Sequence, residues 1–311
     1  MVTRESALVH TDALTESGIR LSGLQLPEIL AENSPDDSAP ILSLCQTTTY
    51  RWSLTDDLVH YPASGISAIG LYRPKVEEFE EDLAIDLIRS SNLAISSLSW
   101  IGGLTGCDGN PQAEALYDAR ESMRFAAAIQ AGTVAIITGG LGRHIGKQAH
   151  RLMLDALRHL CDEAETLGLR LALHPFSSAR MKGRTLIRSL ADTLNVIEKM
   201  NRPCLGILLD LQELANDPDL PGAISSITPL VHCVRITDRR PRLGGERQRL
   251  GERLTGQAGL IRELVHAGYH GPIEIDLWSE HDHPVEHYDL LIRECRAGYE
   301  VLQSALDTAA S

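Results

Sequence analysis

The segment LRLALHPFSS, residues 169–178, decides the fold. An apolar run of strand length follows Gly168, which has the position of a helix terminator, and the run stops at His174 and Pro175. This pattern is typical of a buried parallel strand, which is apolar on both faces and presents a polar side chain where it ends. The segment therefore predicts a parallel sheet with His174 at its carboxyl edge.

Seven other segments have strand-like composition, and helix-like segments separate them. The eight predicted strands cover 41–49, 68–73, 93–103, 133–140, 169–175, 204–210, 231–238 and 272–278. Eight βα units in succession predict a single (β/α)8 TIM barrel. The alternative is an open doubly wound sheet, but no glycine-rich dinucleotide fingerprint follows the first strand.

The chain divides into a short N-terminal extension and one barrel domain. Residues 1–38 are polar and end in a loop-like ENSPDDSAP segment, so they predict an arm. Residues 39–311 contain all eight units. With 311 residues and 43% hydrophobic content, the chain is long enough for one large core.

Composition disfavours several classes of protein. The formal net charge is −13 and no basic stripe is visible, so nucleic acid is not an expected partner. No apolar run approaches the length of a membrane span, and the N-terminus lacks the pattern of a signal peptide. The six cysteines have no CxxC spacing, which favours reduced, buried thiols and a cytoplasmic location.

The active site of such a barrel lies at the carboxyl ends of its strands. In the last strand, alternation places Glu274 and Asp276 on one side, and we expect that side to face the barrel interior. Three polar residues also have a structural explanation: Asp210 as a cap of the next helix, His174 as a hydrogen-bonded core histidine, and Arg235 in a surface salt bridge. The residues expected at the mouth are Thr47, Thr48, Thr49, Arg73, Trp100, Gly139, His174, Asp210, Arg235 and Asp276.

Two loops near the mouth are rich in ionisable residues. The segment after the seventh strand holds arginines from Arg239 to Arg262, and most of them fit a solvated loop, with one or two covering an anionic substrate. The segment SEHDHPVEH, 279–287, has the histidine density of a metal site, but Pro284 and the following helix start favour an exposed loop.

Several segments together carry a family resemblance over residues 41–302. They are TTTYRWSL, GISAIGLYR, LAISSLSWIGG, GLRLALHPF, GILLD, VHCVRITD and AGYHGPIEIDLWSE. In these segments the chain resembles the xylose-isomerase-like TIM barrels, the sugar phosphate isomerase/epimerase family.

The resemblance implies one divalent metal, held by a Glu on strand five, an Asp on strand six, a His on strand seven and a Glu on strand eight. The two glutamates would move a proton between adjacent carbons. The corresponding residues here are His174, Asp210, Arg235 and Asp276. If Mn, Mg or Zn binds, its ligands are therefore His174, Asp210 and Asp276.

Arg235 changes the expected chemistry, because a guanidinium cannot ligate a metal and repels one. We hypothesise that Arg235 takes over charge neutralisation and bonds Asp210, Asp276 or both. The family's arginine before the seventh helix is matched by Arg253.

These residues suggest an isomerase or epimerase acting on a sugar or sugar phosphate by proton transfer next to a carbonyl. His174 and Asp276 are the candidate acid and base, and Asp210 would orient the site. Arg235, Trp100 and Arg253 would bind the substrate, a small-molecule carbohydrate.

The residues also fit two other functions less well. A metal-free, non-catalytic barrel with carbohydrate-binding or regulatory function is the alternative. An abasic-site endonuclease would need more ligands and a basic face. Barrels of this family often pair, so a homodimer is expected.

Overall fold

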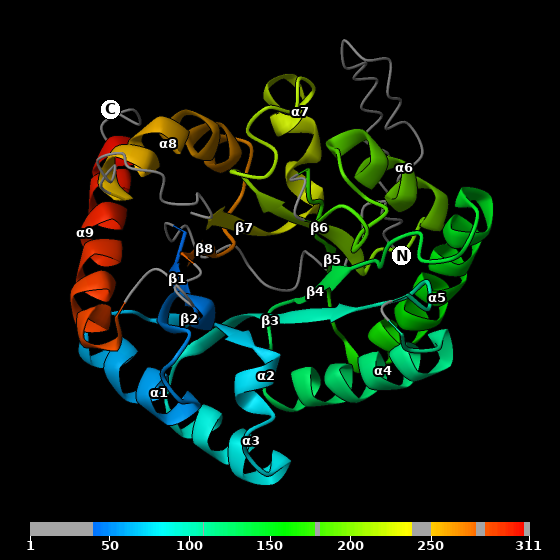
Figure 1. Cartoon of the computed structure of the whole chain (residues 1–311). Helices are drawn as coiled ribbons and strands as arrows, with labels where there is room; N and C mark the ends of the chain where they lie inside the picture. The colour runs from blue at the N-terminus through cyan, green and yellow to red at the C-terminus, as the bar shows by residue number, and fades with distance from the viewer. Residues whose placement is uncertain (1–39, 108, 178–180, 238–249, 278–283, 308–311) are drawn as a thin grey trace, which may run out of the picture.

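The barrel is closed in the computed structural model, which describes residues 40–107, 109–177, 181–237, 250–277 and 284–307. All strands are parallel, each pairs with the next along the chain, and the last pairs with the first (Figure 1). This confirms the predicted (β/α)8 barrel, while the predicted arm at 1–38 lies outside the described residues. The strands are β1 Leu42–Cys45, β2 Ala68–Tyr72, β3 Ala94–Gly102, β4 Val134–Ile137, β5 Leu171–Leu173, β6 Leu205–Asp210, β7 Val231–Thr237 and β8 Ile273–Asp276.

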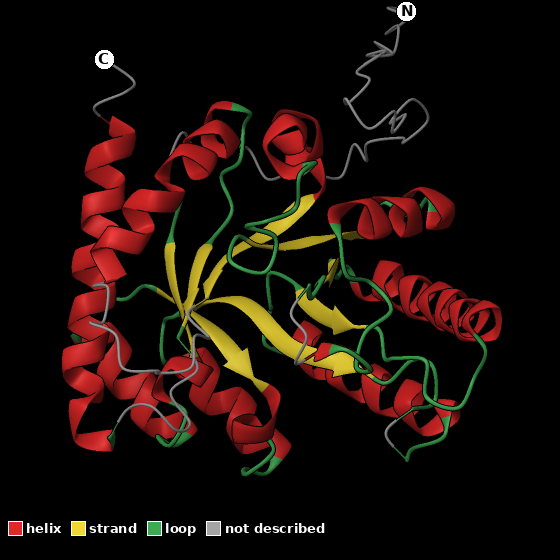
Figure 2. Cartoon of the chain, turned by 45° about the horizontal axis from the view of Figure 1, so that its top comes forward, coloured by secondary structure: helices red, strands yellow, loops and turns green. Residues whose placement is uncertain are grey.

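Helices surround the strands as an outer layer (Figures 1 and 2). The α-helices are α1 Leu54–Ala63, α2 Arg73–Val76, α3 Glu81–Ser90, α4 Gln112–Ala128, α5 Gly146–Leu167, α6 Leu190–Met200, α7 Leu220–Ile227, α8 Leu250–His266 and α9 Tyr288–Asp307. Short 3-10 helices are η2 Gln46–Thr49, η4 Thr228–Leu230 and η5 Val285–His287.

The structure differs in three places from what the sequence suggests. The first strand ends at Cys45, because residues 46–49 turn into η2. The acidic segment VEEFEEDLAIDLIRSSN, residues 76–92, has the composition of one helix, but α2 ends at Val76 and α3 covers only Glu81–Ser90. The helix α7 was not predicted, since its LPGAISSI sequence contains Pro221 and Gly222, both weak helix formers.

Alternation along the strands separates two cores. In β6, Ile207 and Leu209 belong to the large core that strands and helices share, whereas Leu208 lies in a smaller inner cluster. That inner cluster consists of Ala135, Ala172, Leu208 and Cys233, with Trp100 packed against it. Few apolar side chains of the described residues therefore fill the barrel axis, which leaves space there for polar groups.

A helix cap begins α1. Ser53 Oγ accepts a hydrogen bond from the Asp56 amide at 3.2 Å, and the Ser53 amide donates to Asp56 Oδ2 at 2.9 Å. This reciprocal capping box makes Ser53 the N-cap. It also fixes the first turn of α1, from which Asp57 points into the protein.

Asp57 and Lys75 form a buried ion pair beneath η2. Thr49 Oγ1 and Gln46 Nε2 donate to the Asp57 carboxylate at 2.6 and 2.8 Å, and Lys75 Nζ donates to the Thr49 carbonyl at 3.1 Å. Burial raises the pKa of Asp57 to about 6, although Lys75 and these hydrogen bonds lower it. The network holds η2 at the carboxyl end of β1, where Thr47 and Thr48 also lie.

Replacing Lys75 by Met should destabilise the fold by roughly 3–5 kcal/mol, because it leaves the Asp57 carboxylate buried without its partner. The variant should lose further stability relative to the parent as the pH rises above about 6. Without Lys75 the folded-state pKa of Asp57 rises further, so the folded variant retains a proton that the folded parent has released. Urea unfolding at pH 5 and pH 8 measures both effects.

The matched control is Lys147→Met, which removes an exposed lysine. It should change stability by about 0.5 kcal/mol or less at either pH. A Lys75→Met deficit that stays constant between the two pH values would contradict the ionic role of Asp57.

Candidate active site

The predicted polar residues of the last four strands are brought together at the carboxyl end of the barrel. His174 follows β5, Asp210 ends β6, Arg235 lies in β7 and Asp276 ends β8. Each side chain is at most 1% exposed. The structure thus assembles these four residues, and their burial excludes a surface salt bridge for Arg235.

Arg235 is the central cation of this cluster. Its Nη2 forms an ion pair with Glu274 Oε1 and donates to the Ser99 hydroxyl at 2.8 Å, and its Nη1 lies 3.7 Å from Asp276 Oδ2. Of the two predicted partners, Asp276 is confirmed, while Asp210 contacts His174. Burial opposes the positive charge, but Glu274 and Asp276 outweigh it and raise the pKa of Arg235.

Glu274 was predicted to face inward but not to be the main partner of Arg235. Its Oε2 accepts hydrogen bonds from the Ser96 and Ser97 hydroxyls, both at 2.7 Å. Gly70 on β2 makes room for this carboxylate, because a Cβ at that position would lie 2.3 Å from Oε2. A pair of adjacent serines and one glycine therefore shape the site of the counter-ion.

Asp276 is oriented by η2. Thr47 Oγ1 donates to Asp276 Oδ1 at 2.5 Å. The neighbouring Thr48 hydroxyl accepts from the Leu277 amide at 3.1 Å and so joins η2 to the end of β8. Burial and then the charges of Asp276 and Glu274 raise the pKa of the Cys45 thiol, which keeps it uncharged beside them.

His174 and Asp210 form a second polar pair. The His174 Nε2 and Asp210 Oδ2 atoms are 3.3 Å apart, and Trp100 Nε1 lies 3.1 Å from His174 Nδ1. Asp210 Oδ1 accepts from the amides of Gln212 and Glu213 at 3.0 and 3.1 Å. Asp210 therefore caps the turn after β6 and not the next helix, α7, which begins only at Leu220, and it also contacts His174.

The residues present do not fit a divalent cation. The part of the chain that the structure describes contains no group of three or more His, Cys, Asp or Glu side chains arranged to hold a metal. His174 and Asp210 contact each other, while Asp276 lies beside the guanidinium of Arg235. A cation at that place would meet a fixed positive charge, and we assign no reaction step to a metal.

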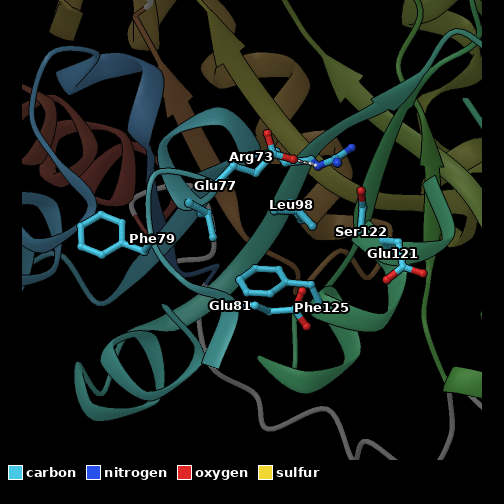
Figure 3. Close-up of a pocket in the computed structure, with 9 residues that line it drawn as sticks. Arg73, Glu77, Phe79, Glu81, Leu98, Glu121, Ser122 and Phe125 are labelled. Atoms are coloured by element: carbon cyan, nitrogen blue, oxygen red, sulfur yellow. Dashed lines mark ion pairs between the residues drawn. The ribbon is translucent and has the colours of Figure 1, made fainter. Parts of the chain in front are cut away.

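Other predicted residues lie away from the cluster or outside the described part. Arg73 is not at the mouth: it pairs with Glu77 at 2.5 Å and with Asp118 on the outer helices. There it lines a pocket of about 200 Å³ with Leu98 and Phe125, shown in Figure 3. Arg253 belongs to α8, but its side chain is outside the described residues, as are the loops 238–249 and 278–283.

A family model described as xylose isomerase-like TIM barrel matches residues 62–297. The chain belongs to this family. No curated protein matches the chain. Among the described residues, no helix of this family member has both the length and the apolar character needed to cross a membrane.

Solved structures of other proteins share the fold. A protein from Sinorhizobium meliloti 1021 is 22% identical, with a TM-score of 0.72, over 83% of this chain and 97% of that one. An L-ribulose 3-epimerase is 15% identical, with a TM-score of 0.68, over 87% and 97%. The 3-keto-D-glucoside 4-epimerase of E. coli is 14% identical, with a TM-score of 0.65, over 84% and 100%.

Substitution of Gly70 by Ala should destabilise the protein by about 1–3 kcal/mol, because the new methyl group overlaps the Glu274 carboxylate. Gly222→Ala in α7 is the matched control, since no atom lies within 4 Å of its added Cβ. The control should be neutral or more stable by about 0.5–1 kcal/mol. Urea unfolding compares the two, and equal midpoints would contradict the packing role of Gly70.

Metal uptake tests the position of Arg235. After dialysis against Mn²⁺, Mg²⁺ or Zn²⁺, elemental analysis should find no stoichiometric metal in the parent protein and near-stoichiometric metal in Arg235→His. The substitution removes the opposing charge and adds an imidazole beside the carboxylates of Glu274 and Asp276. Arg235→Met, which adds no ligand, is the control and should bind less. Stoichiometric metal in the parent would overturn the role of Arg235 as the replacement charge.

Proposed function

We propose that this chain is an isomerase or epimerase that acts on a sugar or sugar phosphate by proton transfer next to a carbonyl. The observation that carries the proposal is the assembly of a histidine–carboxylate pair, His174 with Asp210, and an ion pair, Asp276 with Arg235, at one end of the barrel. Such an assembly supplies groups that take up and release protons within a site sheltered from water.

Asp276 and His174 are the proposed acid and base. The Thr47 hydroxyl donates to Asp276 Oδ1, and the guanidinium of Arg235 lies 3.7 Å from Asp276 Oδ2, so both groups orient this carboxylate. Asp210 holds His174 in place through the contact between Oδ2 and Nε2. Proton transfer by these two groups at adjacent carbons would invert a stereocentre of the sugar or move its carbonyl group to the neighbouring carbon.

Arg235 is proposed to stabilise the negative charge of an enediolate. Its Nε and Nη1 atoms are buried and have no hydrogen-bond acceptor among the described residues. Donors already in place, inside a site of low dielectric constant, stabilise developing charge without reorganisation. Arg235 lies 5.4 Å from the ring of Trp100, the proposed stacking surface for a sugar ring.

The comparisons support a carbohydrate as the substrate class. Two of the structural neighbours are epimerases by name, one for L-ribulose and one for a 3-keto-D-glucoside. These names apply to those proteins. For this chain they justify a panel of ketoses, aldoses, keto-glucosides and their phosphates as the first compounds to test.

A non-catalytic carbohydrate-binding barrel is the second candidate. The observation that favours it is the pairing of Arg235 with Glu274, which leaves this cation partly neutralised before any ligand binds. In that case the cluster would bind sugar hydroxyls by hydrogen bonds and move no proton.

Hydrogen exchange with solvent separates the two candidates. In D2O, the proposed enzyme should incorporate deuterium at a carbon next to the carbonyl of one panel member, detected by NMR. Asp276→Asn should slow incorporation by about 10²–10⁴-fold, because it removes a general acid or base. Asp118→Asn, which removes an exposed carboxylate outside the cluster, is the control and should leave the rate unchanged.

Binding measured by calorimetry on the same panel completes the test. A sugar that binds without deuterium incorporation would support the non-catalytic barrel. The absence of both binding and exchange over the whole panel would contradict both candidates.

A further inference from the structure

The His174 ring is contacted at both nitrogen atoms. Trp100 Nε1 on β3 lies 3.1 Å from Nδ1, and Asp210 Oδ2 on β6 lies 3.3 Å from Nε2. His174 and Asp210 are buried, and Trp100 is half-buried. The ring is thus held between a partner that only donates and a partner that, as a carboxylate, only accepts.

These contacts decide where the imidazole carries its proton. The indole N–H has no acceptor function, so Nδ1 must present its lone pair to Trp100. The proton of the neutral ring is then on Nε2, where it points at Asp210. We infer that Trp100 and Asp210 together hold His174 as the neutral Nε2–H tautomer, which makes Nδ1 its basic nitrogen and Trp100 a positioning residue.

Asp210 is itself fixed in the accepting orientation. Its Oδ1 receives hydrogen bonds from the amides of Gln212 and Glu213, and this directs Oδ2 toward His174. The carboxylate therefore cannot rotate without breaking two backbone hydrogen bonds. The proton on Nε2 thus faces an acceptor with a fixed direction.

Aromatic packing holds the plane of the ring. The Phe176 ring centroid is 3.9 Å from that of His174, and the Trp100 ring is stacked 6.2 Å away. A flip of the imidazole would exchange its nitrogen atoms for carbon atoms at both contacts. Packing therefore holds the ring plane, and the two hydrogen bonds select the orientation of the ring within that plane.

For catalysis, this inference rests on the proposed function. A substrate proton would be accepted at Nδ1 once the substrate displaces the Trp100 N–H, and the electron pair of the broken C–H bond would pass into the enediolate. The resulting imidazolium would keep its Nε2–H directed at Asp210. The tautomer itself does not depend on any reaction, so it is measured without substrate.

The test is a long-range ¹H–¹⁵N correlation spectrum of the full-length protein with ¹⁵N-labelled histidine. Loss of signals in His174→Gln identifies this residue among the twelve histidines. The parent should show an unprotonated, downfield Nδ1 and a protonated Nε2. In Trp100→Phe, which keeps an aromatic ring but lacks the N–H, the Nδ1 signal should move further downfield as its hydrogen bond is lost.

The Asp210→Asn variant replaces the hydrogen-bond acceptor that faces His174 Nε2 by a donor. Its carbonyl oxygen should stay on the two backbone amides, which turns its NH2 group toward Nε2 and demands a lone pair there. In the double variant Trp100→Phe/Asp210→Asn the indole donor at Nδ1 is gone and an amide donor faces Nε2, so the tautomer should invert to Nδ1–H. The single variant, in which Trp100 still donates to Nδ1, should show a mixture of tautomers.

A protonated Nδ1 in the parent, or a double variant that keeps Nε2–H, would overturn the inference. If the Asp210 variants fail to fold, an unshifted Nδ1 signal in Trp100→Phe overturns it alone. If the protein shows the Nε2–H tautomer but catalyses no exchange of substrate hydrogen, the proposed function is contradicted and this inference is still supported.

Discussion

The interior of this barrel depends on one constraint: a guanidinium buried at its axis must have counter-ions close by. Arg235 is fully buried, and removing one partner of a buried ion pair costs roughly 3–5 kcal/mol. Glu274 supplies the first counter-ion from the adjacent strand, because β7 and β8 pair Arg235 directly with Glu274 in register. The fold places the two charges side by side before any side chain adjusts.

The surrounding residues follow from this pair. A buried carboxylate needs hydrogen-bond donors besides its counter-ion, and the Ser96 and Ser97 hydroxyls donate to Oε2 of Glu274. Gly70 leaves the necessary volume. Nearer the mouth, the Thr47 hydroxyl likewise donates a hydrogen bond to the Asp276 carboxylate. The Asp57–Lys75 ion pair beneath η2 fixes the backbone of Thr47. Stability and the geometry of the proposed site are therefore linked.

The sequence predicts the barrel and much of the cluster, because both depend on simple periodicity. Alternation correctly placed Glu274 and Asp276 inward, and strand ends correctly located His174 and Asp210. The sequence did not reveal that Glu274 is the main partner of Arg235, since that pairing depends on the register between β7 and β8. The contact of Trp100 with His174 also escaped prediction: β3 and β4 pair with a register shift between Leu98 and Ile101, so regular alternation does not locate Trp100.

The departures from the family's implied ligand set, taken together, preserve the summed formal charge of the site. Two glutamates, one aspartate and a neutral histidine carry three negative charges, which a divalent cation reduces to one. At the same four positions this chain has neutral His174, two aspartates and Arg235, and their formal charges also leave one negative charge. Replacing a glutamate by histidine while introducing an arginine thus reproduces the charge of a loaded metal site with covalently attached groups.

The cost is geometric: a guanidinium donates hydrogen bonds in fixed directions, whereas a metal ion accepts ligands from several sides. A site built this way suits a substrate whose oxygen atoms reach the Nε and Nη1 donors of Arg235, so substrate shape, rather than metal chelation, would govern binding.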